Sequence, residues 1–307
     1  MRIVYLKHNE IDKQKWDACL KNSYNTHIYA FSWYLDCMAG RWDALVMDDY
    51  QKIMPLPYKK IMGCEYITTP PFIHQLGIFS INKISAETVQ LFLDAIPKKF
   101  AHIYLALNKF NKLPGTNYII NKQSFEIDLI QDYSKIFDNY GINTKNTVFE
   151  FEKQNLTIRY DINIKTGVEF FKKYSKHSSI YKRITFKNLY TLVNTLTKFG
   201  LGKFFSLHNK KGDLVGLCFF LIYMNKSSLL FYAYTPEIKF EKGQTYLINE
   251  FLRMFSNKNI TFDIAISETS QHKLFYKNEL GCMESTYPIY QKFNKIGTII
   301  KSLRLID

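Results

Sequence analysis

The second half of the chain alternates short apolar runs with polar turns in an order that predicts a sheet flanked by helices. Residues 203–207, 214–224 and 228–235 are rich in β-forming residues, and the polar turns between them predict a three-stranded antiparallel meander. Apolar side chains then recur at helical spacing over 244–255. The apolar run 260–266 is too short for a helix and predicts a strand covered on both faces.

A second helix and a last strand follow in this half. Ser267, Glu268 and Thr269 resemble an N-terminal cap for a helix over 270–280, and Gly281 is the expected stop. The run 287–293 predicts a strand that closes the sheet. The predicted order is therefore meander, helix, strand, helix, strand.

The first half follows a similar order with weaker signals. Its expected helices are 12–22, 31–38 and 86–96, the last with Ser85 placed to cap it. Its expected strands are 3–6, 44–47, 53–57, 102–107, 118–120 and 124–129. We therefore expect an α/β (α+β) chain of two domains, 1–140 and 141–307, each a mixed, mostly antiparallel sheet flanked by helices. The join is expected in the polar stretch 132–155.

Length and composition agree with two domains. The chain has 307 residues, of which 47% are hydrophobic, whereas a typical domain has about 100 to 200 residues. No run approaches the roughly 18 apolar residues of a membrane helix, and Lys7 interrupts the first apolar run too early for a secretory signal. We therefore expect a cytoplasmic protein without a transmembrane segment.

Charge is the other global signal, because 41 Lys and Arg against 27 Asp and Glu give a formal net charge of +14. Such an excess attracts polyanions such as tRNA, a nucleotide-linked substrate or an anionic membrane surface. The basic residues are spread along the chain, however, which is also typical of a solvated lysine-rich surface. Contact with tRNA is one of two open interpretations.

Several other chemistries lack their motifs. The five cysteines include no Cys-x-x-Cys, and none of the seven histidines stands in a His-Glu-x-x-His, so no disulfide framework or metal centre is expected. A Gly-x-Ser-x-Gly elbow, a phosphate-binding Gly-x-x-x-x-Gly-Lys-Ser/Thr loop and a Gly-x-Gly-x-x-Gly are also absent from the sequence. Hydrolase, NTPase and dinucleotide-enzyme functions are therefore disfavoured.

Five motifs in the two halves carry a resemblance to a known family. They are Trp33-Tyr34-Leu35-Asp36, Met54-Pro55-Leu56-Pro57, Pro70-Pro71-Phe72-Ile73-His74-Gln75-Leu76-Gly77-Ile78-Phe79, Phe262-Asp263-Ile264-Ala265-Ile266-Ser267 and Phe275-Tyr276-Lys277 with Gly281. They resemble the tandem N-acetyltransferase-type (GNAT) domains of the FemABX group, peptidyltransferases that use aminoacyl-tRNA to add amino acids to peptidoglycan precursors. The chain also looks similar to GNAT-family proteins of Bacteroidetes type.

The resemblance implies a catalytic lysine. In the Fem group an aromatic residue and a lysine, with the lysine four positions before a glycine, place the lysine where negative charge develops on the attacked carbonyl. Tyr276, Lys277 and Gly281 match that pattern. A fixed cation beside an oxyanion acts most strongly in a water-poor pocket. Alternatively, Lys277 is a solvated surface lysine and Tyr276 a core aromatic.

Asp263 is the second catalytic candidate. It stands in the apolar run 260–266, where a carboxylate needs a partner. Its side chain is expected either to orient a substrate amine or to cap the following loop. Where the Fem pattern has glycine after this aspartate, Ala265 and Ile266 stand instead, and Ser267 is counted with the expected substrate-binding residues.

In GNAT proteins a coenzyme A site ordinarily lies at the turn that corresponds to the one before the predicted helix 244–255. There the GNAT pattern is Gln or Arg, two residues, Gly, one residue, then Gly or Ala, so that backbone N–H groups hold a pyrophosphate. Only Gly243 fits, which argues against CoA in this half, although Gly243, Gln244 and Thr245 together remain candidates to hold an anion.

The segment 70–80 is unusually rich in special residues. Two prolines stiffen it, Gly77 permits an unusual backbone angle, and His74 and Gln75 offer polar groups beside phenylalanines. It is expected either to form a wall of the substrate cleft between the domains or to be a strand pair packed at their junction.

These patterns together favour an N-acyltransferase or aminoacyltransferase. The expected donor is acyl-CoA or aminoacyl-tRNA as co-substrate, with no permanently bound cofactor. The acceptor is expected to be a small-molecule or peptide amine, such as a cell-wall or cell-surface precursor. The alternative is a non-catalytic, degenerate GNAT pair that acts in binding or assembly.

Overall fold

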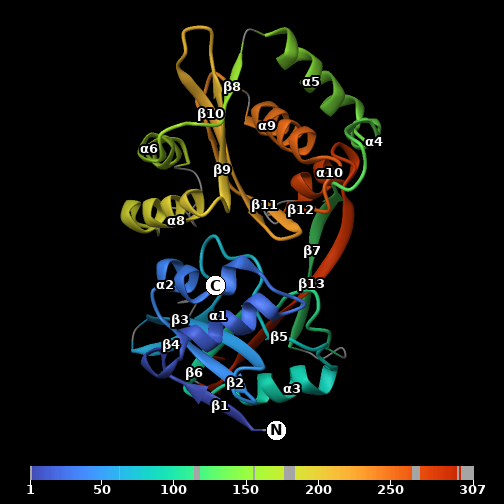
Figure 1. Ribbon diagram of the computed structural model, residues 1–307. Coiled ribbons are helices and arrows are strands. Elements are labelled where there is room, and N and C mark those ends of the chain that lie inside the picture. Colours follow the sequence, from blue (N-terminus) through green and yellow to red (C-terminus); the bar gives the residue numbers. More distant parts are fainter. Residues whose placement is uncertain are drawn as a thin grey trace. The chain divides into compact units, whose positions relative to one another are not determined.

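The chain divides into two compact units. The computed structural model describes residues 2–61, 63–113, 118–154, 156–175, 184–238, 240–264, 270–295 and 297–298. Unit 1 comprises Met1–Lys122 and Thr286–Asp307, and unit 2 comprises Gln123–Ser285 (Figure 1). Strands β7 (Ile119–Asp128) and β13 (Met283–Phe293) each run from one unit into the other.

Unit 1 is built on a mixed sheet. Its strands are hydrogen-bonded in the order β1-β2-β3-β4-β6-β13, with β5 paired to β3, and β4 and β6 form the only parallel strand pair that the structure describes here. The strands are β1 (Ile3–Leu6), β2 (Trp42–Met47), β3 (Lys52–Ile61), β4 (Cys64–Thr68), β5 (Phe79–Ser80) and β6 (Phe100–Ala106). The helices are α1 (Lys13–Asn22), α2 (Ser32–Met38) and α3 (Ala86–Asp94), with short 3₁₀ turns at His8–Glu10 and Ile28–Ala30.

Side-chain caps define where the helices of unit 1 begin. The Asp12 carboxylate accepts hydrogen bonds from the backbone N–H groups of Gln14 and Lys15, so α1 begins at Lys13. The Ser85 hydroxyl accepts one from Thr88 at 3.2 Å, which confirms the predicted cap of α3. The ring of Trp16, on α1, and the ring of Trp42, on β2, are fully buried and lie 5.1 Å apart.

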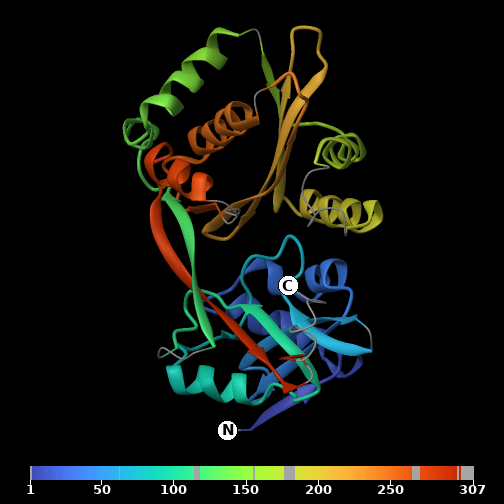
Figure 2. The ribbon, with the colours of Figure 1, turned by 180° about the vertical axis from the view of Figure 1, so that it is seen from behind.

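Unit 2 is a sheet with helices on both faces. Its strands follow the order β7-β12-β11-β10-β9-β8, and among the described strand pairs of this unit only β11 and β12 run parallel. Helices α6 and α8 cover one face, and α9 covers the other (Figures 1 and 2). The strands are β8 (Thr157–Arg159), β9 (Gly202–His208), β10 (Leu214–Tyr223), β11 (Lys226–Tyr234) and β12 (Thr261–Ile264). The helices are α4 (Tyr133–Asp138), α5 (Ile142–Lys153), α6 (Ile164–Tyr174), α8 (Phe186–Lys198), α9 (Phe240–Phe255) and α10 (Ser270–Asn278).

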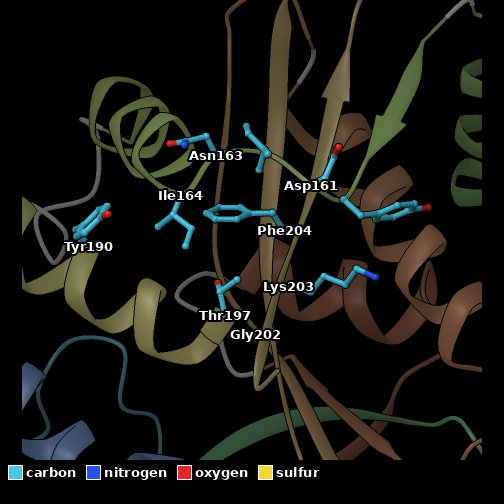
Figure 3. A pocket seen from close by; sticks show the side chains of 10 residues that line it. Asp161, Asn163, Ile164, Tyr190, Thr197, Gly202, Lys203 and Phe204 are labelled. Atoms are coloured by element: carbon cyan, nitrogen blue, oxygen red, sulfur yellow. The ribbon is translucent and has the colours of Figure 1, made fainter. Parts of the chain in front are cut away.

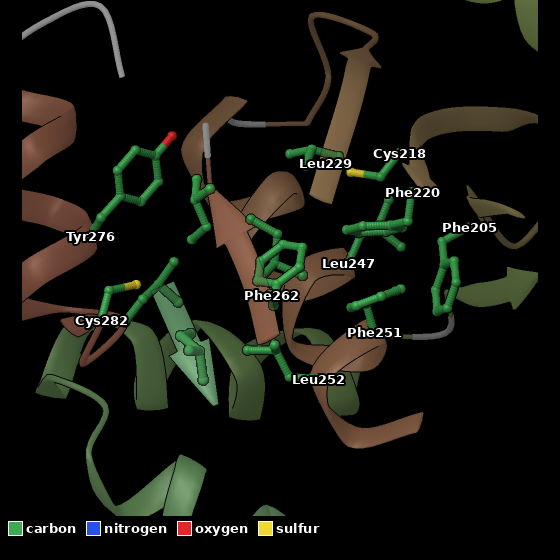
Figure 4. Packing of buried hydrophobic residues seen from close by; sticks show 14 of the residues in the cluster. Phe205, Cys218, Phe220, Leu229, Leu247, Phe251, Leu252, Phe262, Tyr276 and Cys282 are labelled. Carbon is green, nitrogen blue, oxygen red and sulfur yellow. The ribbon is translucent and has the colours of Figure 1, made fainter. Parts of the chain in front are cut away.

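Aromatic side chains fill the core on both faces of this sheet. Under α9, the ring of Phe251 stacks on Phe220 at 4.2 Å and lies 5.2 Å from Phe262 (Figure 4). On the face of α6 and α8, Phe219 and Phe231 stack at 5.3 Å. Each buried aromatic ring removes a large apolar area from water, so these rings supply much of the stability of unit 2.

The predicted domain boundary differs from the one in the structure. We expected the join at 132–155, but α4 and α5 belong to unit 2, which begins at Gln123. The predicted strands 118–120 and 124–129 are one strand, β7, and most of the predicted closing strand 287–293 pairs with β6 of unit 1. Local hydrophobic alternation predicts a strand but not its partner, because the partner is chosen by contacts distant in sequence.

Strand β12 also differs from the prediction. Its burial alternates, since Phe262 and Ile264 are buried and Thr261 and Asp263 are half-buried, so the strand is not covered on both faces. The polar residues stand at alternate positions and therefore share the more open face. The predicted remainder, 265–266, and the predicted cap at Ser267 to Thr269 lie outside the described residues. Within the described part of the chain, no helix is long and apolar enough to cross a membrane.

We predict that Gly77→Ala destabilises unit 1 more than Gly63→Ala. Both glycines have positive φ, +85° and +83°, which costs other residues about 1–2 kcal/mol. A Cβ at Gly77 would stand 2.2 Å from Oδ1 of Asn111, whose oxygen accepts a hydrogen bond from Ile78, whereas a Cβ at Gly63 would meet nothing within 4 Å. Overpacking adds about 1–3 kcal/mol at Gly77. Urea unfolding of both variants measures the difference, and equal losses would contradict this packing.

Candidate functional site

Helix α9 begins at Phe240 and is the next element of the chain after β11, which ends at Tyr234. Gly243, in the first turns of the helix, lies against Tyr234, so that an added Cβ would stand 2.8 Å from Cε1 of that ring and 2.7 Å from Cγ2 of Ile238. This close packing accounts for a glycine at the position. The first N–H groups of a helix lack partners within the helix and carry a partial positive charge, so they form a natural site for an anion.

Two predicted anion-binding residues are buried in the same turn. Gln244 and Thr245 are 8% and 3% exposed. The Nε2 atom of Gln244 is shielded from solvent and has no hydrogen-bond partner among the residues that the structure describes. A buried amide without a partner is costly, so Gln244 is available to donate to a bound group.

Strand β11 pairs in parallel with β12. Among the described residues, the ladder joins Lys226 to Thr261, Ser227 to Phe262 and Ser228 to Asp263. The other end of β11, at Tyr234, precedes α9. The predicted catalytic residue Asp263 thus pairs with the first part of β11.

Asp263 lies among polar side chains on the face of the sheet turned away from α9. The hydroxyl of Ser124 donates a hydrogen bond of 2.6 Å to Oδ1 of Asp263. Glu126 is opposite Asp263 in the antiparallel ladder of β7 and β12, so the two carboxylates share a face. The hydroxyl of Ser285 donates to Oε1 of Glu126 at 3.2 Å. Sequence reasoning found Asp263 but missed Ser124 and Glu126, because only the register brings them together.

The buried thiols of unit 2 are poor nucleophiles. Burial, and then the negative charge of Asp263, raises the pKa of the Cys282 thiol far above its ordinary value. Burial raises the pKa of Cys218 to about 12. Since the thiolate is the reactive form, neither group is suited to carry an acyl intermediate.

Tyr276 and Lys277 on α10 have contrasting surroundings. Tyr276 is 3% exposed, and its ring lies 5.8 Å from Phe125 (Figure 4). The side chain of Lys277 is 60% exposed, and its Nζ stands 3.5 Å from Oε2 of Glu284. Consecutive helical residues point about 100° apart, because a turn takes about 3.6 residues. Lys277 is therefore not in the water-poor surroundings that its proposed role calls for, and the role itself stays a prediction.

The predicted pair His74 and Gln75 lies in unit 1. The ring of His74 makes an edge contact with Tyr29 at 5.3 Å, and its Nε2 atom is shielded from solvent, with no hydrogen-bond partner in the described part of the chain. Burial lowers the pKa of His74 to about 4. The side-chain oxygen of Gln75 accepts a hydrogen bond of 3.2 Å from the backbone of Lys109, which gives it a structural role. Ser267, also predicted to bind substrate, lies outside the described residues.

A pocket that the sequence did not indicate is present in unit 2. It has a volume of about 400 Å³ and is lined by residues of the loop after β8, of α8 and of the start of β9. None of the predicted site residues lines it. The signal that it leaves in the sequence is weak, because aromatic residues such as Tyr160 and Tyr190 are frequent throughout the chain.

No family model matches this chain, and no curated protein matches it in sequence. Solved structures match it over nearly its whole length. FemX has a TM-score of 0.62 at 13% identity, with 99% of this chain and 100% of FemX covered. L-PGS from Bacillus licheniformis has 0.57 at 13%, with 96% and 97% covered, and a protein of unknown function from Bacteroides thetaiotaomicron has 0.58 at 11%, with 95% and 100% covered. The fold is therefore GNAT/FemABX-like, which confirms the predicted resemblance and fold class.

We predict that His74 makes the folded state less stable as the solution becomes acidic. Its pKa is about 4 in the folded chain and about 6.5 when unfolded, so between these values the unfolded state binds the additional proton. The contribution is absent above about pH 6.5 and grows as the pH falls toward 4. His74→Phe removes this titration, so the free energy of unfolding of the variant should rise relative to that of the wild type as the pH falls from about 6.5 toward 4. Urea unfolding from pH 7 to 4.5 tests this, and parallel curves would refute it.

Proposed function

We propose that this protein transfers an acyl or aminoacyl group from acyl-CoA or aminoacyl-tRNA to a primary amine, at a site in unit 2 between β11, β12 and the N-terminus of α9. The observation that carries the proposal is the Asp263 carboxylate on β12, which the Ser124 hydroxyl holds beside β11, the strand that precedes α9. This arrangement provides a carboxylate on one strand and, after the neighbouring strand, an anion-binding helix terminus. The GNAT/FemABX-like fold over the full chain supports it.

The donor is held by its phosphate groups in this proposal. Both acyl-CoA and aminoacyl-tRNA carry phosphates, and the first turn of α9 offers backbone N–H groups to them. The amide of Gln244, for which the described part of the chain offers no hydrogen-bond partner, donates to the same anion. The excess of 14 positive charges raises the local concentration of either donor.

Asp263 orients the acceptor and receives its proton. The Ser124 hydroxyl fixes the carboxylate in place through Oδ1. The acceptor nitrogen forms a bond to the acyl carbon, and the C–S bond of the thioester or the C–O bond of the tRNA ester breaks. The amine proton passes to the Asp263 carboxylate, and the departing thiolate or alkoxide takes up a proton from solvent or from the enzyme. Glu126, on the same face, adds negative charge that attracts an ammonium group.

Among the donors, aminoacyl-tRNA is favoured over acyl-CoA. The first turns of α9 have Phe240 and Thr245 where the CoA-binding pattern calls for Gln or Arg and for Gly or Ala. Gly243 keeps its place in that pattern, but its contact with Tyr234 already explains it. The net charge of the chain also suits a polyanion.

A second candidate is a non-catalytic protein that binds or assembles cell-surface precursors. The exposure of Lys277 and its ion pair with Glu284 favour it, because an exposed cation is screened by water and stabilises an oxyanion weakly. The two candidates differ in turnover but not in ligand binding. Binding and transfer must therefore be measured separately.

We predict that a phosphate-bearing donor stabilises the folded protein. A ligand that binds only the native state raises the melting temperature by mass action. A thermal-shift series compares acetyl-CoA, longer acyl-CoAs, aminoacyl-tRNA and UDP-linked peptidoglycan precursors at low and moderate salt. Gln244→Leu, which keeps the size of the side chain but removes the amide, should reduce the shift by the donor. Absence of a shift with every donor would refute the donor site.

We predict that Asp263→Asn lowers kcat of transfer by about a hundred-fold or more, since general-base catalysis contributes roughly 10²–10⁴-fold. Ser124 can still donate to the amide oxygen, so the melting temperature should change little.

Lys277→Met tests the oxyanion role, with Lys273→Met on the same helix as its control. Unchanged kcat in Asp263→Asn would eliminate Asp263 as the base, and equal kcat in the two lysine variants would eliminate Lys277 from the mechanism.

A further inference from the structure

Strand β9 has an open edge over its first residues. The backbone N–H of Ile222 donates to the carbonyl of Leu201 at 2.9 Å, so this pair is a hydrogen-bonded pair of the antiparallel ladder with β10. Such pairs alternate with non-bonded ones along a ladder. The backbone groups of Gly202 and Phe204 therefore face away from β10. On that side β8 ends opposite Ser206, so within the described chain no strand pairs with Gly202 and Phe204.

The pocket of about 400 Å³ lies along this open edge (Figure 3). On one side of the strand, Phe204 points toward Ile164 and α8, which contributes Tyr190 to the lining. On the other side Lys203 points away from these residues, and its Nζ stands 5.0 Å from the ring centre of Tyr160. The pocket thus has an apolar wall, a wall with a cation, and main-chain hydrogen-bonding groups between them.

Both walls are held by packing that needs no ligand. Gly167 of α6 lies so close to Phe204 that an added Cβ would be 2.6 Å from the ring. The ring of Tyr160 rests edge-on against Phe205 at 4.8 Å. A short connection joins α8 to β9, and a hydrogen bond of 2.8 Å from the backbone N–H of Leu201 to the carbonyl of Leu196 fixes it. The pocket is therefore preformed on regular elements, as binding sites for rigid docking are.

We propose that this edge of β9 binds an extended peptide as an added strand. The N–H and C=O groups of Gly202 and Phe204 match the main chain of an extended segment, which adds hydrogen bonds regardless of its sequence. Side chains opposite Gly202 and Phe204 would face the apolar wall, and the side chain opposite Lys203 would face its ammonium group. The ligand is thus a peptide in which an acidic residue stands between two apolar ones.

The recess of the edge favours a single peptide over a second copy of this chain. Gly202 is buried and Phe204 is 3% exposed, so this edge of β9 is recessed between the two walls of the pocket. A lone extended chain can enter such a groove, whereas the edge of another folded sheet carries its own flanking helices. This site does not depend on the proposed transfer reaction, because its lining shares no residue with Asp263 or α9.

The test uses a fluorescein-labelled peptide, acetyl-Thr-Val-Glu-Val-Thr-amide, titrated with the full-length protein and followed by fluorescence anisotropy. Tyr190→Ala and Lys203→Glu should each weaken binding by about ten-fold or more, because they remove part of a wall and reverse its charge. Phe199→Ala, an exposed aromatic of the same region outside the pocket, should leave binding unchanged. A peptide with Lys in place of Glu should prefer Lys203→Glu to the wild type.

A second peptide, N-methylated at both valines, isolates the main-chain contribution. It keeps every side chain but loses the N–H groups that face the edge, so it should bind at least about ten-fold more weakly. Hydrogen exchange should show new protection of the Phe204 amide with the parent peptide. Equal binding of the methylated peptide, or absence of saturable binding at millimolar protein, would overturn the proposal. So would a dimer of the wild type that Thr197→Trp, which fills the groove, converts to a monomer.

Discussion

The burial of β9, β10 and β11 on both faces is the constraint on which unit 2 depends. Phe219 and Phe231 pack on the side of α6, and Phe220 packs on the side of α9. A slip of one residue would exchange the two sets of side chains, so the register of these strands is strongly fixed. The end of β11 at Tyr234 fixes in turn where α9 begins, and the start of β9 at Gly202 fixes the open edge. Both candidate sites inherit their geometry from this core.

The chemically useful groups lie where this double burial ends. Toward β12 the face away from α9 bears Ser124, Glu126 and Asp263, and the Ser124 hydroxyl gives the aspartate the partner that a half-buried carboxylate needs. Toward β8 the strand pairing stops, and backbone groups of β9 remain available at the pocket. The central strands of the sheet are thus covered on both faces, whereas polar groups at β12 and at the edge of β9 provide two places where a ligand can form hydrogen bonds.

The sequence predicts most elements of unit 2 because their periods are strong, but it does not predict their partners. Residues 214–224 and 228–235 correspond closely to β10 and β11. The predicted helix 244–255 begins earlier, at Phe240, because Gly243 does not stop the helix but lets it pack on Tyr234. Strands β7 and β13 each run from one unit into the other, and Asp263 lies opposite Glu126. Both features depend on the pairing of segments that are distant in sequence, which the local hydrophobic pattern does not encode. The motif left open whether Lys277 is buried in a site or exposed on the surface, and the structure has the exposed arrangement, with Tyr276 in the core.

The two proposed sites of unit 2 are far enough apart to act independently. Asp263 is on β12 and the open edge is on β9, and β11 and β10 lie between them in the sheet. Three strand spacings of about 4.8 Å separate them by roughly 14 Å. Substitutions at that separation without shared partners combine additively within about 0.5 kcal/mol. Loss of transfer through Asp263 therefore leaves peptide binding at β9 intact, and a coupling between the two would mean that the peptide itself reaches the transfer site.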